Sequence, residues 1–480
     1  MTLPSFRDPS GYTWVGPKIV HRAAMIESLA PTTDQADLEL LIGQFQAEGK
    51  WIPAKAVDPA TLPAYLQGKG PLPKRAWEHP RIFFPSYAHE WSPAMLHSAA
   101  ELTLELNERL LEVGWELKDA SPTNVLFEGS RPIFVDHLSP SLRQPGQMGW
   151  TAYGQFIRTF IIPLCLHRLN GLPMSWVHLA GRDGIPPEVA FRQLRILDHL
   201  RPSVFGLITL PILLSRHEGK KSAQGLRVWK DGDEGIGRQV TARLIRGLRR
   251  RLRNWAPRSA QETFWSHYDQ SGESYTCEAL REKEVFIQHA LDTCKPKAVL
   301  DLGCNCGRYS SLAASANARV VAIDSDSDCV TRLFKRANAE ALDIQPLIMD
   351  LGRPSPALGW ENGEDAPFLA RVEGRFDMLF ALAIMHHLLV RERIPLERII
   401  SHLAEQTTRW AVIEWVPPDD PQFQRLAGPD QCLYSMLTIK TVEDRISAWF
   451  KIIAKQSLTE AGRTLYLLER RDSALIDWAL

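Results

Sequence analysis

The stretch VLDLGCNCGRYS, Val299 to Ser310, decides the fold class of this chain. Its apolar start predicts a buried strand that runs into Asp301, and a turn carrying Gly303 and Gly307 then leads into a helix. Glycines let the backbone turn tightly beside a ligand, and the N-terminus of the following helix faces that ligand. The stretch therefore predicts a nucleotide pocket in an α/β protein.

A second strand is predicted over Ala318 to Asp324, and its acid can accept hydrogen bonds from both hydroxyls of a ribose. The glycine spacing differs from the G-x-G-x-x-G of dinucleotide-binding folds, because three residues separate Gly303 from Gly307. A carboxylate at Asp301 would also repel a pyrophosphate. It would favour a cationic ligand that carries an amino group and a sulfonium.

On these residues the segment resembles motif I of the class I S-adenosylmethionine-dependent methyltransferases. The resemblance implies a Rossmann-like sheet, S-adenosylmethionine as the cofactor, and Asp324 as the ribose-binding acid. A nicotinamide or flavin site, and a glycine-rich turn without a ligand, are the alternatives. The predicted cofactor-binding residues are Asp301, Gly303, Asn305, Gly307, Asp324, Asp350 and Leu351.

The rest of the C-terminal half alternates helices and strands, which predicts a wound α/β domain. A helix is expected over Asp328 to Leu342. Further strands are expected over Ile344 to Met349, Phe376 to Leu382, Trp410 to Trp415, Phe450 to Gln456 and Thr464 to Leu468. The short connection between the last two predicts an antiparallel hairpin. Seven strands closed in this way fit the methyltransferase sheet better than a dinucleotide-binding sheet.

Polar residues follow two of these strands. The resemblance implies that Asp350, with Leu351 after it, contacts the exocyclic amine of an adenine; the alternative is an acid that caps the strand end. His386 and His387 follow the strand that borders cofactor and acceptor in the family. Because neighbouring side chains on a helix point about 100° apart, only one should face the pocket. A neutral imidazole there could take a proton from an acceptor, and helix capping is the alternative.

Cys304 and Cys306 form a C-x-C pair with no nearby His/Cys partners, so no metal site is predicted and small residues in a tight turn are expected. Seven cysteines without regular spacing indicate reduced thiols. Equal numbers of acidic and basic residues, 56 each, give no strong signal for nucleic acid. The start of the chain does not resemble a secretory signal, and the longest apolar run contains Pro211, so a cytoplasmic protein without a transmembrane segment is expected.

A chain of 480 residues should hold two or three domains. We expect an accessory domain over 1–215, a basic linker and helix over 216–260, and a cofactor-binding domain over 261–480. The linker's arginines, interleaved with leucines at helical spacing, predict an amphipathic helix. They indicate either an anionic partner or a helix packed on a neighbouring domain. The arginines are Arg238, Arg243, Arg246, Arg249, Arg250, Arg251, Arg253 and Arg258.

The N-terminal half carries a second motif. Asp119 and Asn124 are spaced as D-x-x-x-x-N and are followed by a strand, a turn at Gly129, a second strand and Asp136. This resembles the catalytic and metal-binding loops of kinase-like phosphotransferases. The pattern departs from that family because no Gly-rich loop precedes it and Leu117-Lys118 stands in place of His-Arg. A degenerate kinase-like lobe of α+β type, acting in recognition or as a scaffold, is therefore preferred over an active phosphotransferase or a chance match.

The order of parts resembles bacterial two-part methyltransferases of nodulation type, a resemblance that extends to GRTLYLLER at Gly462 to Arg470. It implies methyl transfer to an acceptor, whether small molecule, glycan, lipid or protein. A non-catalytic binding protein with a cofactor fold is the remaining alternative. Four aromatic residues upstream of the domain predict either a lid over the cofactor or a hydrophobic entry helix. They are Phe264, Trp265, Tyr268 and Tyr275.

Overall fold

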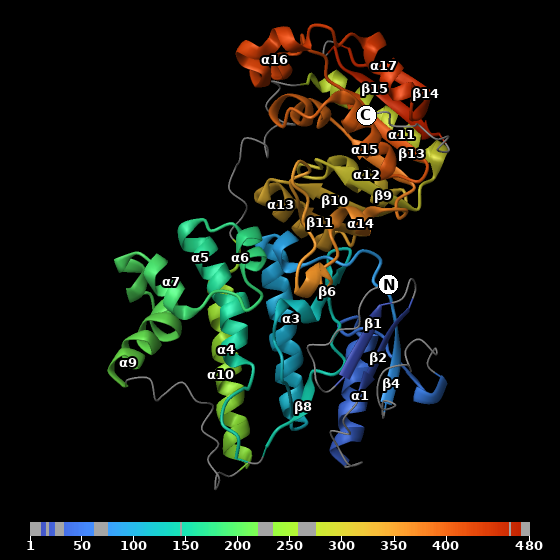
Figure 1. Ribbon diagram of the computed structural model, residues 1–480. Helices are drawn as coiled ribbons and strands as arrows, with labels where there is room; N and C mark the ends of the chain where they lie inside the picture. The colour runs from blue at the N-terminus through green and yellow to red at the C-terminus, as the bar shows by residue number, and fades with distance from the viewer. Residues whose placement is uncertain are drawn as a thin grey trace. The chain divides into compact units, whose positions relative to one another are not determined.

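The computed structural model describes residues 11–15, 19–24, 33–61, 75–144, 146–218, 234–257, 275–459 and 462–471. The chain divides into two compact units (Figure 1). The first comprises Met1–Arg258 with Leu358–Asp365, and the second comprises Ser259–Ala357 with Ala366–Leu480. No helix in the described ranges is both long enough and apolar enough to cross a membrane.

The second unit is built on a seven-stranded sheet with the order β11-β10-β9-β12-β13-β15-β14. Its strands are β9 (Ala298–Leu302), β10 (Arg319–Asp324), β11 (Ile344–Ile348), β12 (Met378–Ala381), β13 (Trp410–Trp415), β14 (Phe450–Ser457) and β15 (Thr464–Arg470). The first five are parallel, and β15 pairs antiparallel with both β13 and β14. The predicted seven-stranded α/β sheet with its terminal hairpin is thus confirmed.

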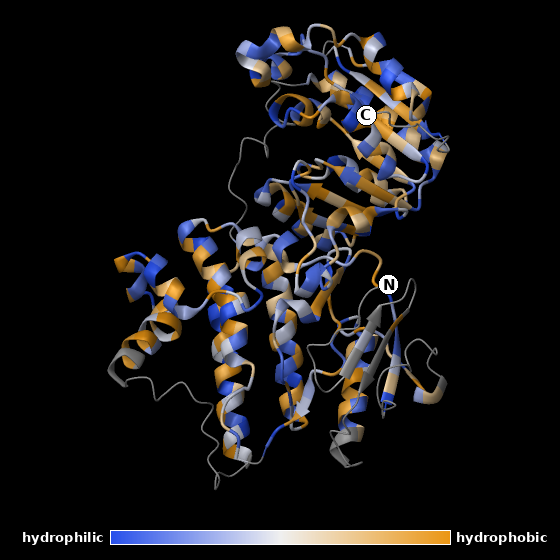
Figure 2. Cartoon of the chain, in the orientation of Figure 1, coloured by the Kyte–Doolittle hydropathy of each residue, from blue (hydrophilic) through white to orange (hydrophobic). Residues whose placement is uncertain are grey.

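The sheet is apolar because helices cover parallel strands on both faces. Every residue of β9 is buried, and Figure 2 shows the strands of this sheet coloured mainly as hydrophobic. The register places Asp301 beside Ala322 of β10 and Phe380 of β12, in the middle of the sheet. The helices of the unit are α11 (Cys277–Cys294), α12 (Arg308–Ser315), α13 (Ser327–Ala339), α14 (Phe368–Val372), α15 (Leu396–Glu405), α16 (Pro421–Ala427) and α17 (Ile439–Ser447).

The first unit has a four-stranded antiparallel sheet of order β1-β2-β4-β3 and two further strand pairs, β5–β8 and β6–β7. The strands are β1 (Gly11–Val15), β2 (Ile19–Ala24), β3 (Lys55–Val57), β4 (Arg75–Pro80), β5 (Trp115–Leu117), β6 (Val125–Glu128), β7 (Arg131–Phe134) and β8 (Pro140–Leu142). Its helices are α1 (Thr33–Ala47), α3 (Pro93–Glu112), α4 (Tyr153–Phe156), α5 (Ile162–Asn170), α6 (Met174–Ala180), α7 (Pro187–Gln193), α8 (Pro202–Val204), α9 (Leu210–Glu218) and α10 (Glu234–Asn254).

Helix α10 contains most of the predicted arginine run. Ile245, Leu248 and Leu252 are buried, as the amphipathic pattern predicts, and the helix packs on α3. Arg249 pairs with Glu108 of α3 at 3.0 Å. The exposed side carries a row of arginines at spacings of three and four residues, namely Arg243, Arg246, Arg250 and Arg253. An anionic partner for this row stays a prediction.

Candidate functional site

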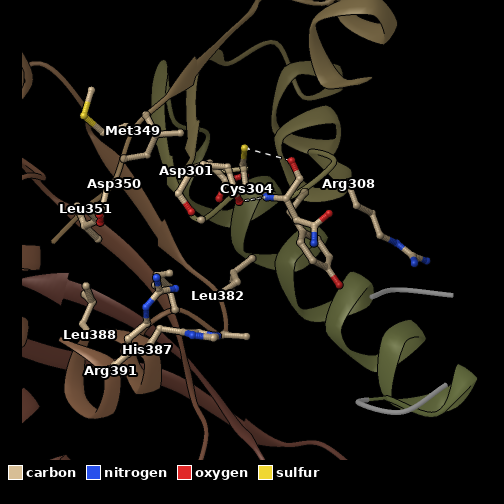
Figure 3. A pocket seen from close by; sticks show the side chains of 18 of the residues that line it. Asp301, Cys304, Arg308, Met349, Asp350, Leu351, Leu382, His387, Leu388 and Arg391 are labelled. Carbon is tan, nitrogen blue, oxygen red and sulfur yellow. Dashed lines mark hydrogen bonds between the residues drawn. The ribbon is translucent and has the colours of Figure 1, made fainter. Parts of the chain in front are cut away.

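A pocket opens at the carboxyl ends of β9, β10, β11 and β12 in the second unit (Figure 3). Most of the predicted cofactor-binding residues and one of the predicted histidines line it. Figure 3 shows Asp350 and Leu351 on one side and Arg308 on the other, with Asp301 and Cys304 between them. The predicted residues that line the pocket are Asp301, Gly303, Asn305, Asp324, Asp350, Leu351 and His387.

Asp301 lies at the base of the pocket and is 2% exposed. Its Oδ2 accepts a hydrogen bond from the Ser310 hydroxyl of α12 at 2.5 Å. Burial raises the pKa of the Asp301 carboxyl from 3.8 to about 6, although the Ser310 hydrogen bond and the nearby Lys283 charge oppose this rise. A buried carboxylate without a direct ion pair is costly, so a bound cation would stabilise it.

The turn after β9 depends on its glycines. Gly303 has a φ of 74°, and a Cβ there would lie 3.1 Å from the side chain of Ile384. The amides of Gly303 and Cys304 both donate to the carbonyl of Ile323 at 2.9 Å, which ties the turn to β10. Gly307 is the N-cap residue just before α12, with a φ of 74°, and a Cβ there would lie 2.3 Å from Leu333. Gly307 therefore permits close packing against α13 and is not among the residues that line the pocket.

Asp324 at the end of β10 is held in orientation by backbone amides. Its two oxygens accept from Asn305 N and Asp326 N, each at 2.8 Å. Burial raises the pKa of Asp324, and these two amides act against the rise. Asn305 has a positive φ of 50°, and its side-chain oxygen accepts from Cys306 N at 2.5 Å. The acid of the second strand and the glycine turn are thus one hydrogen-bonded unit.

Asp350 follows β11, is exposed, and accepts a hydrogen bond from Gly352 N at 2.9 Å. This contact shapes the local turn, and the carboxylate still lines the pocket. Both roles predicted for Asp350, contact with an adenine amine and capping of the strand end, stay predictions. Leu351 is half-buried beside it and supplies an apolar surface.

The two predicted histidines are placed differently. His387 lines the pocket, whereas His386 is 1% exposed and is not among the lining residues. Their ring centroids are 4.3 Å apart. Burial, aided by the charges of Arg391 and Arg463, lowers the pKa of His387 to about 4. Burial and the neighbouring His387 also lower the pKa of His386 well below its usual value. His387 is therefore a neutral imidazole at pH 7.

Sequence reasoning missed a network of buried charges beside the pocket. Glu414 at the end of β13 is fully buried and accepts hydrogen bonds from Tyr275 and Lys283, each at 2.6 Å. Arg463, also fully buried, lies 3.6 Å from Glu414 and donates to Asp420 at 2.8 Å. Tyr275 and Lys283 line the pocket.

The network places the Lys283 ammonium in the pocket that Asp301, Asp324 and Asp350 also line. The Lys283 ammonium lies over the rings of Tyr275 at 4.9 Å and Tyr309 at 4.7 Å. Burial alone would raise the pKa of Glu414, but the charges of Lys283 and Arg463 hold it below its ordinary value. One sequence signal was available, because Glu414 interrupts the apolar strand WAVIEW. Its partners are Lys283 in α11, Tyr275 just before that helix, and Arg463 just before β15, which only the fold brings together.

The chain is similar to known proteins, in part of its length or over nearly all of it. The family described as tellurite resistance protein TehB matches residues 273–355, which include the glycine turn and the three strand-end acids Asp301, Asp324 and Asp350. Part of the chain is 29% identical over 138 residues to the O-antigen chain terminator bifunctional methyltransferase/kinase WbdD of Escherichia coli, covering 28% of this chain and 18% of that protein.

The chain is similar to a nodulation protein over nearly its whole length. Nodulation protein NoeA of Rhizobium meliloti (strain 1021) is 27% identical over 473 residues, covering 98% of this chain and 96% of that protein. The crystal structure of N-methyltransferase NodS from Bradyrhizobium japonicum WM9 superposes with a TM-score of 0.31 and 13% identity, covering 40% of this chain and 97% of NodS. The similarity to NoeA therefore spans nearly the whole length of both proteins.

The kinase-like motif lies in the first unit. The predicted strand, turn and strand are present as β6 and β7, with Gly129 at a φ of 58°. Asn124 donates to the carbonyl of Asp119 at 3.3 Å, and Asp136 accepts from Leu138 N at 3.1 Å. Asp119 Oδ1 is buried without a hydrogen-bond partner among the described residues. The roles of these three residues stay predictions.

Of the four aromatic residues predicted to form a lid or an entry helix, Phe264, Trp265 and Tyr268 lie outside the described residues. Tyr275 is 6% exposed, and its hydroxyl donates to Glu414. Its ring lies 4.4 Å from the Arg463 guanidinium. Tyr275 is thus part of the wall of the pocket.

Proposed function

We propose that the chain catalyses transfer of a methyl group from S-adenosylmethionine to an acceptor. The observation that carries the proposal is a single pocket lined by Asp301, Asp324 and Asp350 at the ends of three adjacent parallel strands. These carboxylates suit an amino group, a ribose and an adenine amine. When bound, S-adenosylmethionine would supply an electrophilic methyl group.

The chemistry of the side chains fits this cofactor. Asp301 is a buried acid and would hold the amino group, while Lys283 is the buried cation that would hold a carboxylate. Both oxygens of Asp324 are oriented by backbone amides of the protein itself. Protein contacts that fix a binding side chain reduce the entropic cost of ordering it when the cofactor binds.

His387 is the proposed proton acceptor when the methyl acceptor is neutral. Its place on the pocket wall and its neutral imidazole at pH 7 support this role. We propose that His386, buried behind it, fixes the local packing. The first unit is proposed to recognise the acceptor or to act as a scaffold.

The test is calorimetric titration of the full chain with S-adenosylhomocysteine, followed by incubation with methyl-labelled S-adenosylmethionine and extract of cells that make the protein. Binding together with a labelled product is expected. Absence of binding by the folded chain would refute the proposal. Binding without any labelled product would instead favour a non-catalytic cofactor-fold protein.

Cofactor affinity should depend on pH through Asp301. Because its pKa is raised to about 6, the carboxylate becomes neutral as the pH falls below that value and no longer attracts an amino group. Affinity for S-adenosylhomocysteine should fall by up to about tenfold per pH unit below pH 6, as measured by calorimetry between pH 5 and 8. The variant D301N should bind weakly at every pH. A parent affinity that is constant over this range would contradict the assignment.

The variant H387A should keep its affinity for S-adenosylhomocysteine and lose about 10²–10⁴-fold in the rate of methyl transfer, the usual contribution of a general base. H387Q serves as the matched polar replacement. Because the pKa of His387 is about 4, the parent rate should show no inflection from this residue between pH 6 and 9. A full rate in H387A would remove the proposed role.

The scaffold proposal for the first unit predicts that ATP with millimolar magnesium leaves the melting temperature of the full chain unchanged. Local hydrogen bonds already engage the side chains of Asn124 and Asp136. Differential scanning fluorimetry of the parent and of D136A checks this. Magnesium-dependent stabilisation by ATP that D136A abolishes would favour the phosphotransferase alternative.

A further inference from the structure

Three thiols gather around the turn that precedes α12. Cys304 lines the pocket, Cys306 follows Asn305 in the same turn, and Cys329 lies in the first turn of α13. The Sγ atoms of Cys306 and Cys329 are 3.7 Å apart. Cys329 Sγ is also 3.6 Å from the side-chain oxygen of Asn305. A disulfide needs an S–S distance of about 2.05 Å, so a sulfur displacement of less than about 2 Å would join them.

Cys306 is the more accessible thiol of the pair. Its carbonyl and that of Gly307 each accept a hydrogen bond from the Arg336 guanidinium at 2.7 Å, and α12 begins at the next residue. These contacts fix the backbone of the turn that carries Cys306. Cys306 is half-buried, whereas Cys329 is fully buried. Cys306 is therefore the thiol that an oxidant reaches first, and Cys329 is placed to react with it.

We propose that Cys306 and Cys329 form a reversible disulfide that weakens cofactor binding by the adjacent turn. With a peroxide as oxidant, the Cys306 thiolate attacks one peroxide oxygen and becomes a sulfenic acid, and the other oxygen leaves as water after taking up a proton. The Cys329 thiol then attacks the sulfenic sulfur, forms the S–S bond and releases a second water. Two thiols are oxidised and one peroxide is reduced.

The effect on the cofactor site follows from Asn305. Its amide donates to Asp324 at 2.8 Å, and its side-chain oxygen accepts from the amide of Cys306. Formation of the disulfide would pull Cys306 toward α13. Asn305 would then be displaced, because its side-chain oxygen contacts both Cys306 N and Cys329 Sγ. Asp324 then loses part of the support that orients it. This consequence rests on the proposed cofactor function, whereas formation of the disulfide does not.

The experiment uses the full chain carrying C277S and C432S, because those two cysteines are exposed and would form intermolecular bonds. The reduced protein is treated with hydrogen peroxide and examined by intact mass and by peptide mapping without reductant. A loss of two hydrogen atoms and a Cys306–Cys329 cross-linked peptide are expected. Calorimetry should then show S-adenosylhomocysteine affinity reduced at least about tenfold, within the roughly 5–150-fold range typical of coupled sites. Dithiothreitol should restore the affinity.

The matched variants are C329S and C329A, and a melting curve checks that each is folded. Neither should form the cross-link. In neither should peroxide cause a loss of S-adenosylhomocysteine affinity that dithiothreitol restores. A protein that resists cross-linking while Cys306 is oxidised would overturn the proposal. A cross-linked protein with unchanged affinity would also overturn it. If the reduced chain binds no S-adenosylhomocysteine but still forms the cross-link, the proposed function fails and the disulfide site stands.

Discussion

The variant E414A should lower the free energy of unfolding of the second unit by about 3–5 kcal/mol, the usual cost of removing one partner from a buried ion pair. Glu414 is fully buried and faces Lys283 at 2.6 Å and Arg463 at 3.6 Å. In E414A, the buried cations Lys283 and Arg463 both lose their shared partner. Asp420, which pairs with Arg463, is then the remaining acid of the network. Urea unfolding of the full chain, followed by circular dichroism, measures the change.

The matched control for E414A is E397A. Glu397 pairs with Arg445 at 3.0 Å, but both side chains are about half exposed. Its loss should therefore cost only about 0.2–1 kcal/mol. The double variant K283M/E414L should recover much of the stability lost in E414A, because apolar residues can replace a buried ion pair without a desolvation cost. Equal costs for E414A and E397A would show that the network contributes no more than a surface pair.

The second large effect is expected at Asp324. D324A should reduce affinity for S-adenosylhomocysteine by about 10²–10⁴-fold, since each charge-assisted hydrogen bond to a ribose hydroxyl contributes about 1.5–3 kcal/mol. The same change removes the acceptor of Asn305 N, so the turn loses an anchor as well. Calorimetric titration of the full chain measures the affinity.

Two variants separate these contributions. D324N keeps an acceptor for the Asn305 amide and loses the charge, so its loss of affinity should be smaller than that of D324A. D343N is the matched control, because Asp343 is an exposed acid before β11 that pairs with Arg319 at 3.1 Å. It should bind as the parent does. Parent-like affinity in D324A would show that the ribose is not held at this strand end.

Much of the second unit was predictable because its signals are local. Buried parallel strands are continuous apolar runs, and an acid or a glycine turn at their carboxyl ends is visible within a few residues. The predicted strand over Trp410 to Trp415 agrees with β13 at both ends. The predicted helix over Asp328 to Leu342 ends three residues earlier, at Ala339, because Ala341 adopts a positive φ of 54°.

The site was predictable only in part, since a pocket is formed by residues far apart in the chain. The strand-end acids could be named from their positions, but Lys283 could not, because a lysine in a helix is usually exposed. Its burial follows from the fold, which places α11 against β13 and β15. The close packing of Gly307 against Leu333 could not be named either, because Gly307 lies just before α12 and Leu333 lies in α13.

By itself, the sequence VLDLGCNCGRYS determined the class of fold and indicated the proposed kind of ligand, because a strand, an acid and a glycine turn act within one short segment. Only the tertiary structure decided which of the two histidines lines the pocket, which cation stands beside Asp301, and that Cys306 lies 3.7 Å from Cys329. Those relations join segments that are separated by tens of residues. They arise when strands and helices pack, and packing distances are not encoded in the spacing of residues along the chain.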